Sequence, residues 1–210
     1  MTKDYDKVAL DEGRILPLME EFYTIQGEGY YSGHAAYFIR LGGCDVGCHW
    51  CDVKESWDAE LHPLTDVHNI VARAKAEANL AVITGGEPLM YNLDYITSEL
   101  KKAGLQTNIE TSGAYELSGD FDWICLSPKK NKLPTQSVYD AADELKVVIY
   151  NKHDFIFAEE QAARVNDNAL LLLQVEWSKR AEMNPLIVEY VKKNPQWKIS
   201  VQTHKYLDIP

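Results

Sequence analysis

The sequence predicts an α/β fold of one kind, a shortened and partly open (β/α) barrel. Apolar runs alternate with helix-like segments along the chain, which is the pattern of parallel strands joined by crossover helices. A complete eight-fold barrel needs about 250 residues, whereas this chain has 210 and spends residues 42–63 on a loop. The sequence contains neither a linker nor an internal repeat. We therefore expect residues 1–210 to form one domain, in which the polar residues 1–13 are disordered.

The expected strands are the eight apolar runs at residues 18–24, 36–41, 81–84, 106–110, 123–127, 145–150, 170–175 and 198–202. Four helices are expected at residues 66–78, 93–103, 154–165 and 185–193. Thr65 is the expected N-cap of the first helix, and Gly104 is expected to end the second. Four helices are too few for a complete barrel, so we expect the barrel to be open.

Composition and charge argue against several kinds of partner. The hydrophobic fraction is 46%, and no apolar run reaches the length of about 18 residues that a membrane helix needs. No basic segment is followed by an apolar stretch and a small-residue cleavage site, so we expect a cytosolic protein without a membrane partner. The net charge of -11 disfavours a nucleic-acid partner, because such binding depends on Lys and Arg neutralising phosphates.

Cys44, Cys48 and Cys51 have the spacing C-x₃-C-x₂-C, which favours an iron–sulfur cluster. An electron-carrying [4Fe–4S] cluster takes four cysteines, so three leave one iron open to a small molecule. Structural zinc is the alternative, with His49 as a fourth ligand, but His49 lies between two cysteines of the same short loop. Cys125 stands alone in an apolar run and is predicted to be a small buried hydrophobic residue. A non-catalytic iron–sulfur electron carrier would need Cys125 as its fourth ligand.

A second motif, Thr-Gly-Gly-Glu-Pro at residues 84–88, follows the third predicted strand. The glycine pair would let a ligand approach the backbone closely, although a tight strand-to-helix turn would use the same residues. Parallel α/β folds place ligands at the carboxyl ends of their strands. The motif and the cysteine loop are therefore expected to converge on one site.

Together the cysteine loop and the GGEP motif resemble the signature of radical S-adenosylmethionine (SAM) enzymes. The resemblance implies a radical SAM barrel with a [4Fe–4S] cluster held by Cys44, Cys48 and Cys51, whose open iron chelates the methionine part of SAM. It also implies that the GGE motif contacts the methionine amino group. A glycyl-radical-enzyme activase, which acts on a protein, would share both motifs.

Five further motifs narrow the resemblance to one family. They are YTIQGEG at residues 23–29, FIR at 38–40, IETSG at 109–113, SPK at 127–129 and QTHKYL at 202–207. Nearly end to end, the chain resembles the 7-carboxy-7-deazaguanine synthases, and the first and last of these motifs argue against an activase. The resemblance implies a carbon–nitrogen lyase of queuosine or other 7-deazapurine biosynthesis. It would convert 6-carboxy-5,6,7,8-tetrahydropterin to 7-carboxy-7-deazaguanine, with ring contraction and loss of ammonia.

The same resemblance implies a mechanism and partners. A flavodoxin- or ferredoxin-like protein reduces the cluster, and SAM cleavage yields a 5′-deoxyadenosyl radical that removes the hydrogen at the substrate C6. No side chain is expected to make that abstraction, so the catalytic residues are left unassigned. SAM is regenerated, and a homodimer is usual in the family.

Carried over by position, the resemblance implies two sets of binding residues. The substrate set is Ile25, Gln26, Gly27, Arg40, Thr84, His204 and Pro210. The SAM set is Trp50, Asp52, Gly86, Glu110, Ser112, Ser127, Pro128, Lys129 and Gln174. Arginine suits a carboxylate held by two hydrogen bonds, although Arg40 could equally form a structural salt bridge. Glu110 could serve a buried ion pair, and Gln174 is followed by Val175 where the family often has proline.

Magnesium is the cofactor that the sequence puts in doubt. The family commonly has Ser or Thr directly after the Cys-Asp pair, where it supplies an oxygen ligand to Mg²⁺. This chain has Val53 there, and a valine side chain cannot bind a hard cation, which takes oxygen donors. No protein ligand to Mg²⁺ is therefore predicted.

Overall fold

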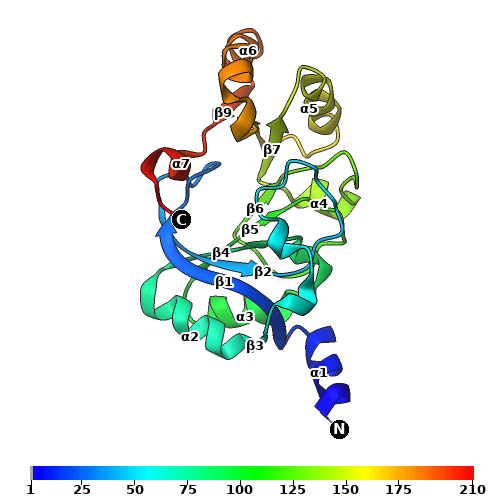
Figure 1. Ribbon diagram of the computed structural model, residues 1–210, viewed down its shortest axis with the longest axis vertical. Helices are drawn as coiled ribbons and strands as arrows, with labels where there is room; N and C mark the ends of the chain where they lie inside the picture. Colours follow the sequence, from blue (N-terminus) through cyan, green and yellow to red (C-terminus); the bar gives the residue numbers. More distant parts are fainter. Residues whose placement is uncertain (1) are drawn as a thin grey trace.

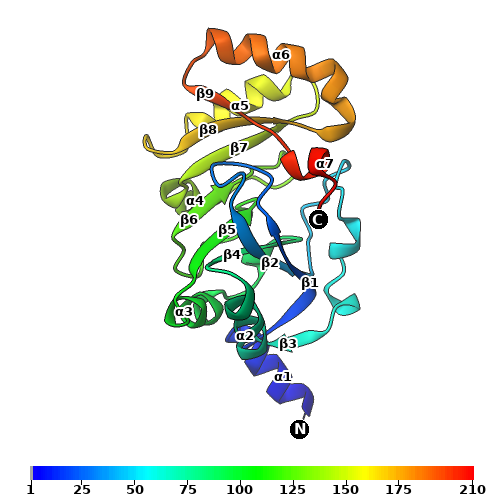
Figure 2. The ribbon, with the colours of Figure 1, turned by 90° about the vertical axis from the view of Figure 1, so that its left-hand side faces the viewer.

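The computed structural model, which describes residues 2–210, contains a nine-stranded sheet in the order β3-β1-β2-β4-β5-β6-β7-β8-β9. Strands β2 and β4 to β9 run parallel, while β1 pairs antiparallel with β2 and β3. The strands are β1 (Ile15–Ile25), β2 (Ala35–Leu41), β3 (Leu64–Asp66), β4 (Leu80–Gly85), β5 (Gln106–Thr111), β6 (Trp123–Leu126), β7 (Glu144–Ile149), β8 (Leu170–Val175) and β9 (Trp197–Ser200). Figures 1 and 2 show the sheet curling into an open barrel, as predicted.

Helices cover the outer face of the curled sheet. They are α2 (Val67–Glu77), α3 (Asp94–Lys102), α4 (Gln136–Ala141), α5 (Asp154–Ala162) and α6 (Arg180–Lys193), with α1 (Thr2–Asp11) and α7 (Thr203–Leu207) near the chain ends. Figure 1 shows α2 and α3 at one end of the molecule, α5 and α6 at the other, and α7 beside the end of β1. Among the helices of residues 2–210, none has both the length and the apolar character needed to cross a membrane.

The eight expected strands and four expected helices are all present, with shifted ends. β3, α1, α4 and α7 were not expected. β1 and β2 are antiparallel because only residues 26–34 connect them, too few for the crossover that a parallel pair needs. The N-cap of α2 is Asp66, which accepts the His68 N–H at 2.8 Å, and not Thr65, which lies in β3. α6 begins at Arg180, so Pro185 lies inside it.

Disorder was expected over residues 1–13. Met1 lies outside the described residues, but Thr2–Asp11 form helix α1. Ala9 on this helix is buried, and its carbonyl accepts the Arg14 N–H at 2.8 Å. Packing of this kind holds a terminal segment that its polar composition alone would leave mobile.

Alternation along the strands divides the barrel into two layers. Outward side chains such as Ile39, Ile83 and Leu145 are completely buried and pack with apolar side chains of the helices. Inward side chains include polar and charged groups, among them Glu110 on β5 and Lys146 on β7, which line the interior. This alternation buries one face of each strand under helices and leaves the other to line the interior.

Candidate active site

A cavity of about 310 Å³ lies at the carboxyl ends of the barrel strands, a size in the usual range for small-molecule sites. All but one of the residues expected at the site line it. They are Ile25, Gln26, Gly27, Arg40, Cys44, Cys48, Trp50, Cys51, Asp52, Thr84, Gly86, Glu110, Ser112, Ser127, Lys129, Gln174, His204 and Pro210. The exception is Pro128, which is buried beside the cavity wall.

One wall of the cavity is the cysteine loop that follows β2. Cys44, Cys48 and Cys51 are free thiols that line the cavity, and the Cys51 N–H donates to the Cys48 carbonyl at 3.1 Å. Gly47 turns the loop with φ +68°, a conformation that favours glycine. Burial raises the pKa of the Cys44 and Cys48 thiols. A bound metal would therefore have to displace their protons.

Three cysteines suit a cubane cluster better than a single ion. Cys125 is buried in β6 and does not line the cavity, so it cannot complete a fourth position there. Within residues 2–210, no group of three or more His, Cys, Asp or Glu side chains is arranged to hold a single metal ion. A [4Fe–4S] cluster does not require such a group, because each thiolate binds a different iron.

The glycine pair at the end of β4 brings this strand against the cysteine loop. A Cβ atom on Gly86 would lie 2.2 Å from the Gly43 carbonyl oxygen and 2.8 Å from the Cys44 Cβ. The Glu87 N–H also donates to the Gly43 carbonyl at 2.9 Å. Gly86 is therefore needed to seat the cysteine loop on the barrel, whatever else it contacts.

Glu87, the residue after Gly86, links the end of β4 to the end of β5 through hydrogen bonds. It is 1% exposed and accepts hydrogen bonds from Thr111 Oγ1 at 2.5 Å, from the Ser112 N–H at 2.8 Å and from the Ser112 hydroxyl. It also accepts the Leu89 N–H at 3.0 Å. The ends of β4 and β5 are thus held together beside the thiols, and the Ser112 hydroxyl is already engaged within the protein.

The segment after β6 supplies a half-buried lysine. Lys129 Nζ donates to the Ser127 carbonyl at 2.5 Å and to Ser127 Oγ at 2.7 Å, and it lies 5.6 Å from the centre of the Trp50 ring. Burial lowers the pKa of Lys129. These contacts bring the SPK motif against the cysteine loop.

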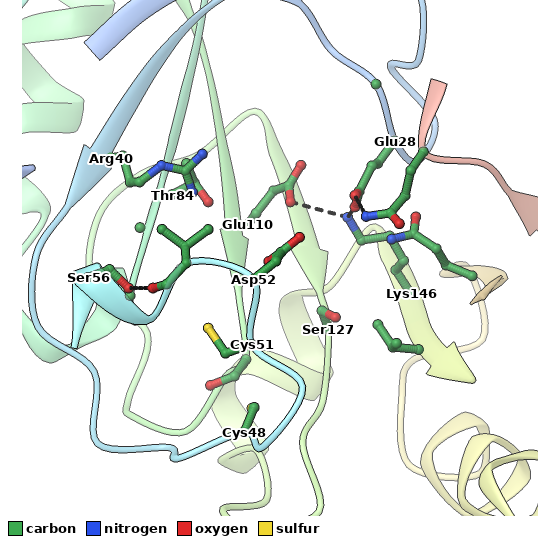
Figure 3. Close-up of a pocket in the computed structure, with 18 of the residues that line it drawn as sticks. Glu28, Arg40, Cys48, Cys51, Asp52, Ser56, Thr84, Glu110, Ser127 and Lys146 are labelled. Carbon is green, nitrogen blue, oxygen red and sulfur yellow. Dashed lines mark hydrogen bonds and ion pairs between the residues drawn. The ribbon is translucent and has the colours of Figure 1, made fainter. Parts of the chain in front are cut away.

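Charged side chains line one side of the cavity, its floor, where Figure 3 shows Lys146 joined to Glu28 and Glu110. Lys146 on β7 is 3% exposed, and its Nζ lies 2.5 Å from Glu28 Oε2 and 3.2 Å from Glu110 Oε2. Gln26 Nε2 donates to Glu110 Oε1 at 2.7 Å, and Gln202 Nε2 donates to Glu28 Oε1 at 2.8 Å. The five side chains form one connected network.

The network sets the charge of its members. Burial raises the pKa of Glu28, but the charge and hydrogen bond of Lys146, together with the bond from Gln202, lower it to about 2. Burial lowers the pKa of Lys146, but the acidic groups around it raise it well above its ordinary value. Glu28 is therefore a carboxylate and Lys146 an ammonium at neutral pH.

Sequence reasoning assigned no role to Glu28, Lys146 or Gln202. Glu28 and Gln202 belong to quoted motifs, and Lys146 interrupts the otherwise apolar run of residues 145–149. A single lysine within such an apolar run was the sequence signal that could have identified Lys146 as a functional residue. Glu110 occupies the buried ion pair that was its alternative reading.

The C-terminal segment closes one side of the cavity. The Thr203 N–H and hydroxyl both donate to the Gly27 carbonyl at 2.9 Å, and a Cβ on Gly27 would lie 2.1 Å from His204 Nδ1. Burial lowers the pKa of His204. Thr24 Oγ1 donates to the Pro210 carbonyl at 3.4 Å. The last residues of the chain are thus packed against the loop that follows β1.

Arg40 and Thr84 are register partners at the ends of β2 and β4, and Figure 3 shows them together at the cavity edge. Arg40 Nε lies 2.6 Å from Glu20 Oε1, with the Phe22 ring centre 6.0 Å from its guanidinium carbon. The salt bridge named as its alternative role is therefore present, and Arg40 also lines the cavity. Gln174 Oε1 accepts the Ser200 hydroxyl at 2.7 Å.

Oxygen ligands for magnesium do not gather beside Cys51. Val53 has an apolar side chain, and its carbonyl accepts the Ser56 hydroxyl at 2.7 Å. Asp52 Oδ2 lies 2.9 Å from Lys205 Nζ, which neutralises it. The residues present therefore do not fit a hard divalent cation.

Comparison with known proteins gives consistent matches. Residues 38–117 match the Radical SAM superfamily. The chain is 64% identical to the 7-carboxy-7-deazaguanine synthase of Flavobacterium psychrophilum over 210 residues, which is 100% of both chains. It is 49% identical to the 7-carboxy-7-deazaguanine synthase of a Synechocystis species, covering 92% of this chain and 93% of the relative. The crystal structure of QueE from Escherichia coli superimposes with a TM-score of 0.81 at 28% identity, covering 92% of this chain and 96% of the other.

Proposed function

This chain belongs to the 7-carboxy-7-deazaguanine synthase family of radical SAM enzymes, and on that premise we propose how its cavity carries out the reaction. The substrate is 6-carboxy-5,6,7,8-tetrahydropterin and the product is 7-carboxy-7-deazaguanine, formed with loss of ammonia. One observation supports this assignment most strongly. A wall of three thiols and a floor of buried charged groups share one cavity.

We propose that Cys44, Cys48 and Cys51 hold a [4Fe–4S] cluster, for which the free thiols and the close seat provided by Gly86 are suited. When bound, the cluster supplies the electron that cleaves SAM to the radical that abstracts the substrate hydrogen. The protein positions the reactants and excludes water and competing partners. The three thiols would hold the cluster and leave room beside them for the amino and carboxylate groups of SAM.

Residues around the thiols would bind SAM. Trp50, Asp52, Gly86 and Ser112 surround the cysteine wall, and Glu110, Ser127, Pro128, Lys129 and Gln174 continue from the strand ends. Lys129, held by Ser127, offers a cation beside the wall. We propose that the backbone at Gly86 receives the methionine amino group, because Gly86 lines the cavity directly beside the cysteine loop.

The floor and its rim would bind the pterin. The 2-amino and N3–H groups of a pterin are neighbouring donors, which the carboxylates of the floor can accept. Ile25 ends β1, Gln26 and Gly27 follow it in the loop beside His204, and Thr84 lies near the end of β4. Arg40 would hold the substrate carboxylate through the nitrogen atoms that Glu20 does not engage.

His204 would be neutral at pH 7, since burial lowers its pKa. A neutral imidazole both donates and accepts a hydrogen bond, so His204 can orient the substrate and move a proton during loss of ammonia. Pro210 lines the same side of the cavity. The C-terminal segment would thus act as one wall of the substrate site.

Three further expectations belong to the proposal. No step is assigned to Mg²⁺, because Val53 and the paired Asp52 do not fit it. A flavodoxin- or ferredoxin-like protein would be the reductant of a cytosolic enzyme. The chain would work as one domain over residues 1–210 and as a homodimer.

The test is anaerobic turnover. Protein reconstituted with iron and sulfide is given dithionite, SAM and 6-carboxy-tetrahydropterin, with and without Mg²⁺, and the product is identified by mass spectrometry. We expect 7-carboxy-7-deazaguanine in both cases and none from Cys48→Ala. SAM cleavage without that product would assign a different substrate. No cleavage by a fully loaded cluster would overturn the proposal.

A further inference from the structure

A buried acidic side chain that the proposed function does not use lies at the start of β7. Glu144 is 3% exposed and alternates with Lys146 along the strand, so both side chains point into the barrel. Glu144 does not line the main cavity, but together with Glu28 and Glu110 it lines a separate void of about 10 Å³. It therefore lies next to the floor, outside the space that a substrate would fill.

Ion pairing does not account for Glu144. Among the ion pairs of the described residues 2–210, none includes it. Its register partner on β6 is Cys125, and burial together with the charge of Glu144 raises the pKa of that thiol well above its ordinary value. Burying an acidic group without a cation costs free energy. The stability of the fold alone therefore does not explain why Glu144 is there.

The partner of Glu144 is the backbone of the loop that follows β1. Glu144 Oε2 accepts the Tyr30 N–H at 2.8 Å. Its other oxygen, Oε1, faces Gly29, where a Cβ atom would lie only 2.3 Å away. Gly29 has φ +67°, a conformation that favours glycine. Hydrogen bonds from backbone N–H groups to a carboxylate are among the stronger ones, so Glu144 anchors residues 29 and 30.

The anchored residues directly follow the part of the loop that belongs to the site. Residues 26–28 line the main cavity. Beyond them, Ser200 Oγ accepts the Gly29 N–H at 3.0 Å, and the Tyr30 ring stacks on Trp123 with the ring centres 4.7 Å apart. The carboxylate at residue 28 has only this loop to hold its backbone. Its position in the floor therefore depends on the anchor at residues 29 and 30.

We propose that Glu144 is a positioning residue for the pterin, because its hydrogen bond to the Tyr30 backbone sets the place of Glu28 in the floor. This inference rests on the proposed function, in which the floor receives the 2-amino and N3–H groups of the substrate. Glu144 itself touches no substrate. The cysteine loop is seated separately, against Gly86. Loss of Glu144 should therefore weaken the binding of the pterin and spare that of SAM.

The test compares three variants in the reconstituted enzyme. Glu144→Ala removes the acceptor of the Tyr30 N–H, whereas Glu144→Gln keeps an oxygen that can accept it. Asp143→Ala is the matched control, because this neighbouring carboxylate also accepts a backbone N–H, that of Ile124 at 2.7 Å, but on β6 and not in the loop. With dithionite as reductant, kcat and the KM values for 6-carboxy-tetrahydropterin and for SAM are measured for each protein.

We expect Glu144→Ala to raise the KM for the pterin about tenfold, which corresponds to about 1.4 kcal/mol. The KM for SAM should stay within about twofold, and kcat should fall by less than the KM for the pterin rises. Glu144→Gln should restore the KM for the pterin to within about threefold of the unaltered chain, because the hydrogen bond is kept. Asp143→Ala should leave both KM values within about twofold.

A second measurement follows the loop without any turnover. Amide hydrogen exchange of the peptide that covers residues 26–34 is recorded by mass spectrometry in the protein without substrate. In Glu144→Ala this peptide should exchange faster by about fivefold or more, since its anchoring bond is lost. A peptide covering residues 44–51 should exchange as in the unaltered chain, because the cysteine loop is seated elsewhere.

Three results would overturn the positioning role: equal rises of the two KM values, a Glu144→Gln variant as impaired as Glu144→Ala, or unchanged exchange of residues 26–34. Glu144→Met, which fills the space without an acceptor, repeats the test if Glu144→Ala does not fold. Product formation by the unaltered chain tests the proposed function separately. An active enzyme whose KM for the pterin is insensitive to Glu144 would fail the positioning proposal alone, so the two failures can be told apart.

Discussion

The two faces of strand β7 are both buried, but one lies among apolar side chains and the other among charged ones. Leu145 and Val147 point outward and are completely buried among apolar side chains. Glu144 and Lys146 alternate with them, point inward and are each 3% exposed. Equal burial therefore has two meanings in this protein. The outer face is packed with apolar side chains, and the inner face holds paired charges beside the cavity.

The energetics of the two faces differ accordingly. Burying apolar side chains stabilises a fold by roughly 25 cal/mol per Å² removed from water. Buried ions must first lose their hydration, and a well-packed apolar replacement is often as stable. The retention of Lys146 between Glu28 and Glu110 is thus better explained by what the cavity binds than by stability.

The largest effect is expected from Lys146→Met. It leaves two largely buried carboxylates without their cation, so the free energy of unfolding should fall by about 3 kcal/mol, the lower end for broken buried pairs. Turnover should be lost even at temperatures where the variant is folded. Urea unfolding and dithionite-driven turnover measure the two effects.

A matched variant separates charge from packing. Lys146→Met/Glu28→Gln/Glu110→Gln removes all three charges and should recover much of the lost stability without recovering turnover. Recovery of turnover along with stability would mean that the inner face is structural, and the contrast between the faces would fail.

The adjacent residue should behave in the opposite way. Leu145→Ala opens a cavity under the helices and should lower the free energy of unfolding by about 2–5 kcal/mol. Turnover per folded molecule should stay within about twofold, because the side chain faces away from the site. A large loss of turnover at full folding, seen by circular dichroism at low temperature, would show that the faces are coupled.

The outer face is also the part of the fold that the sequence predicts best. Apolar periodicity is a local signal, and it located every strand except β3, together with the helices α2, α3, α5 and α6, but it did not locate the polar α1. It did not locate β3, which has three residues, or α4 and α7, with six and five, because such short elements are formed by tertiary contacts. The antiparallel β1 followed from loop length, a signal that was available and was not used.

The inner face was predicted only where motifs named it. The cysteine spacing and the glycine pair are local patterns, so their convergence on one cavity could be expected. The network of Glu28 and Lys146 joins residues 118 positions apart, and no local pattern indicates such a pair. For the same reason, the sequence offered a salt bridge only as an alternative role for Arg40 and did not identify Glu20 as its partner.

Lowering the pH should reduce the stability that ionised Glu28 contributes on the inner face. Its pKa is lowered from 4.5 to about 2, so its contribution to stability is fully present above pH 4.5 and is lost as the pH falls toward 2. The contribution is on the order of 3 kcal/mol or less, since one pKa unit corresponds to about 1.4 kcal/mol and buried, coupled groups share it. Urea midpoints measured from pH 6 to pH 3 should fall more steeply in the unaltered chain than in Glu28→Gln. Parallel slopes would mean that Glu28 is not held ionised by the network.

The smallest effect on stability, but a useful one, is expected from Lys205→Gln. The partner of Lys205, Asp52, is 65% exposed, so losing the ion pair should change the free energy of unfolding by less than about 1 kcal/mol. The bridge nevertheless joins the C-terminal wall to the residue after Cys51, so a looser wall should raise the KM for the pterin about fivefold, which corresponds to about 1 kcal/mol. Asp52→Asn breaks the same bridge from the other side and should raise the KM for the pterin at least as much, because it also changes a residue of the proposed SAM site. An unchanged KM in both variants would make the bridge an ordinary surface ion pair. A raised KM would show that a contact contributing little to stability still positions residues of the inner face. No contact of the outer face is expected to have that effect.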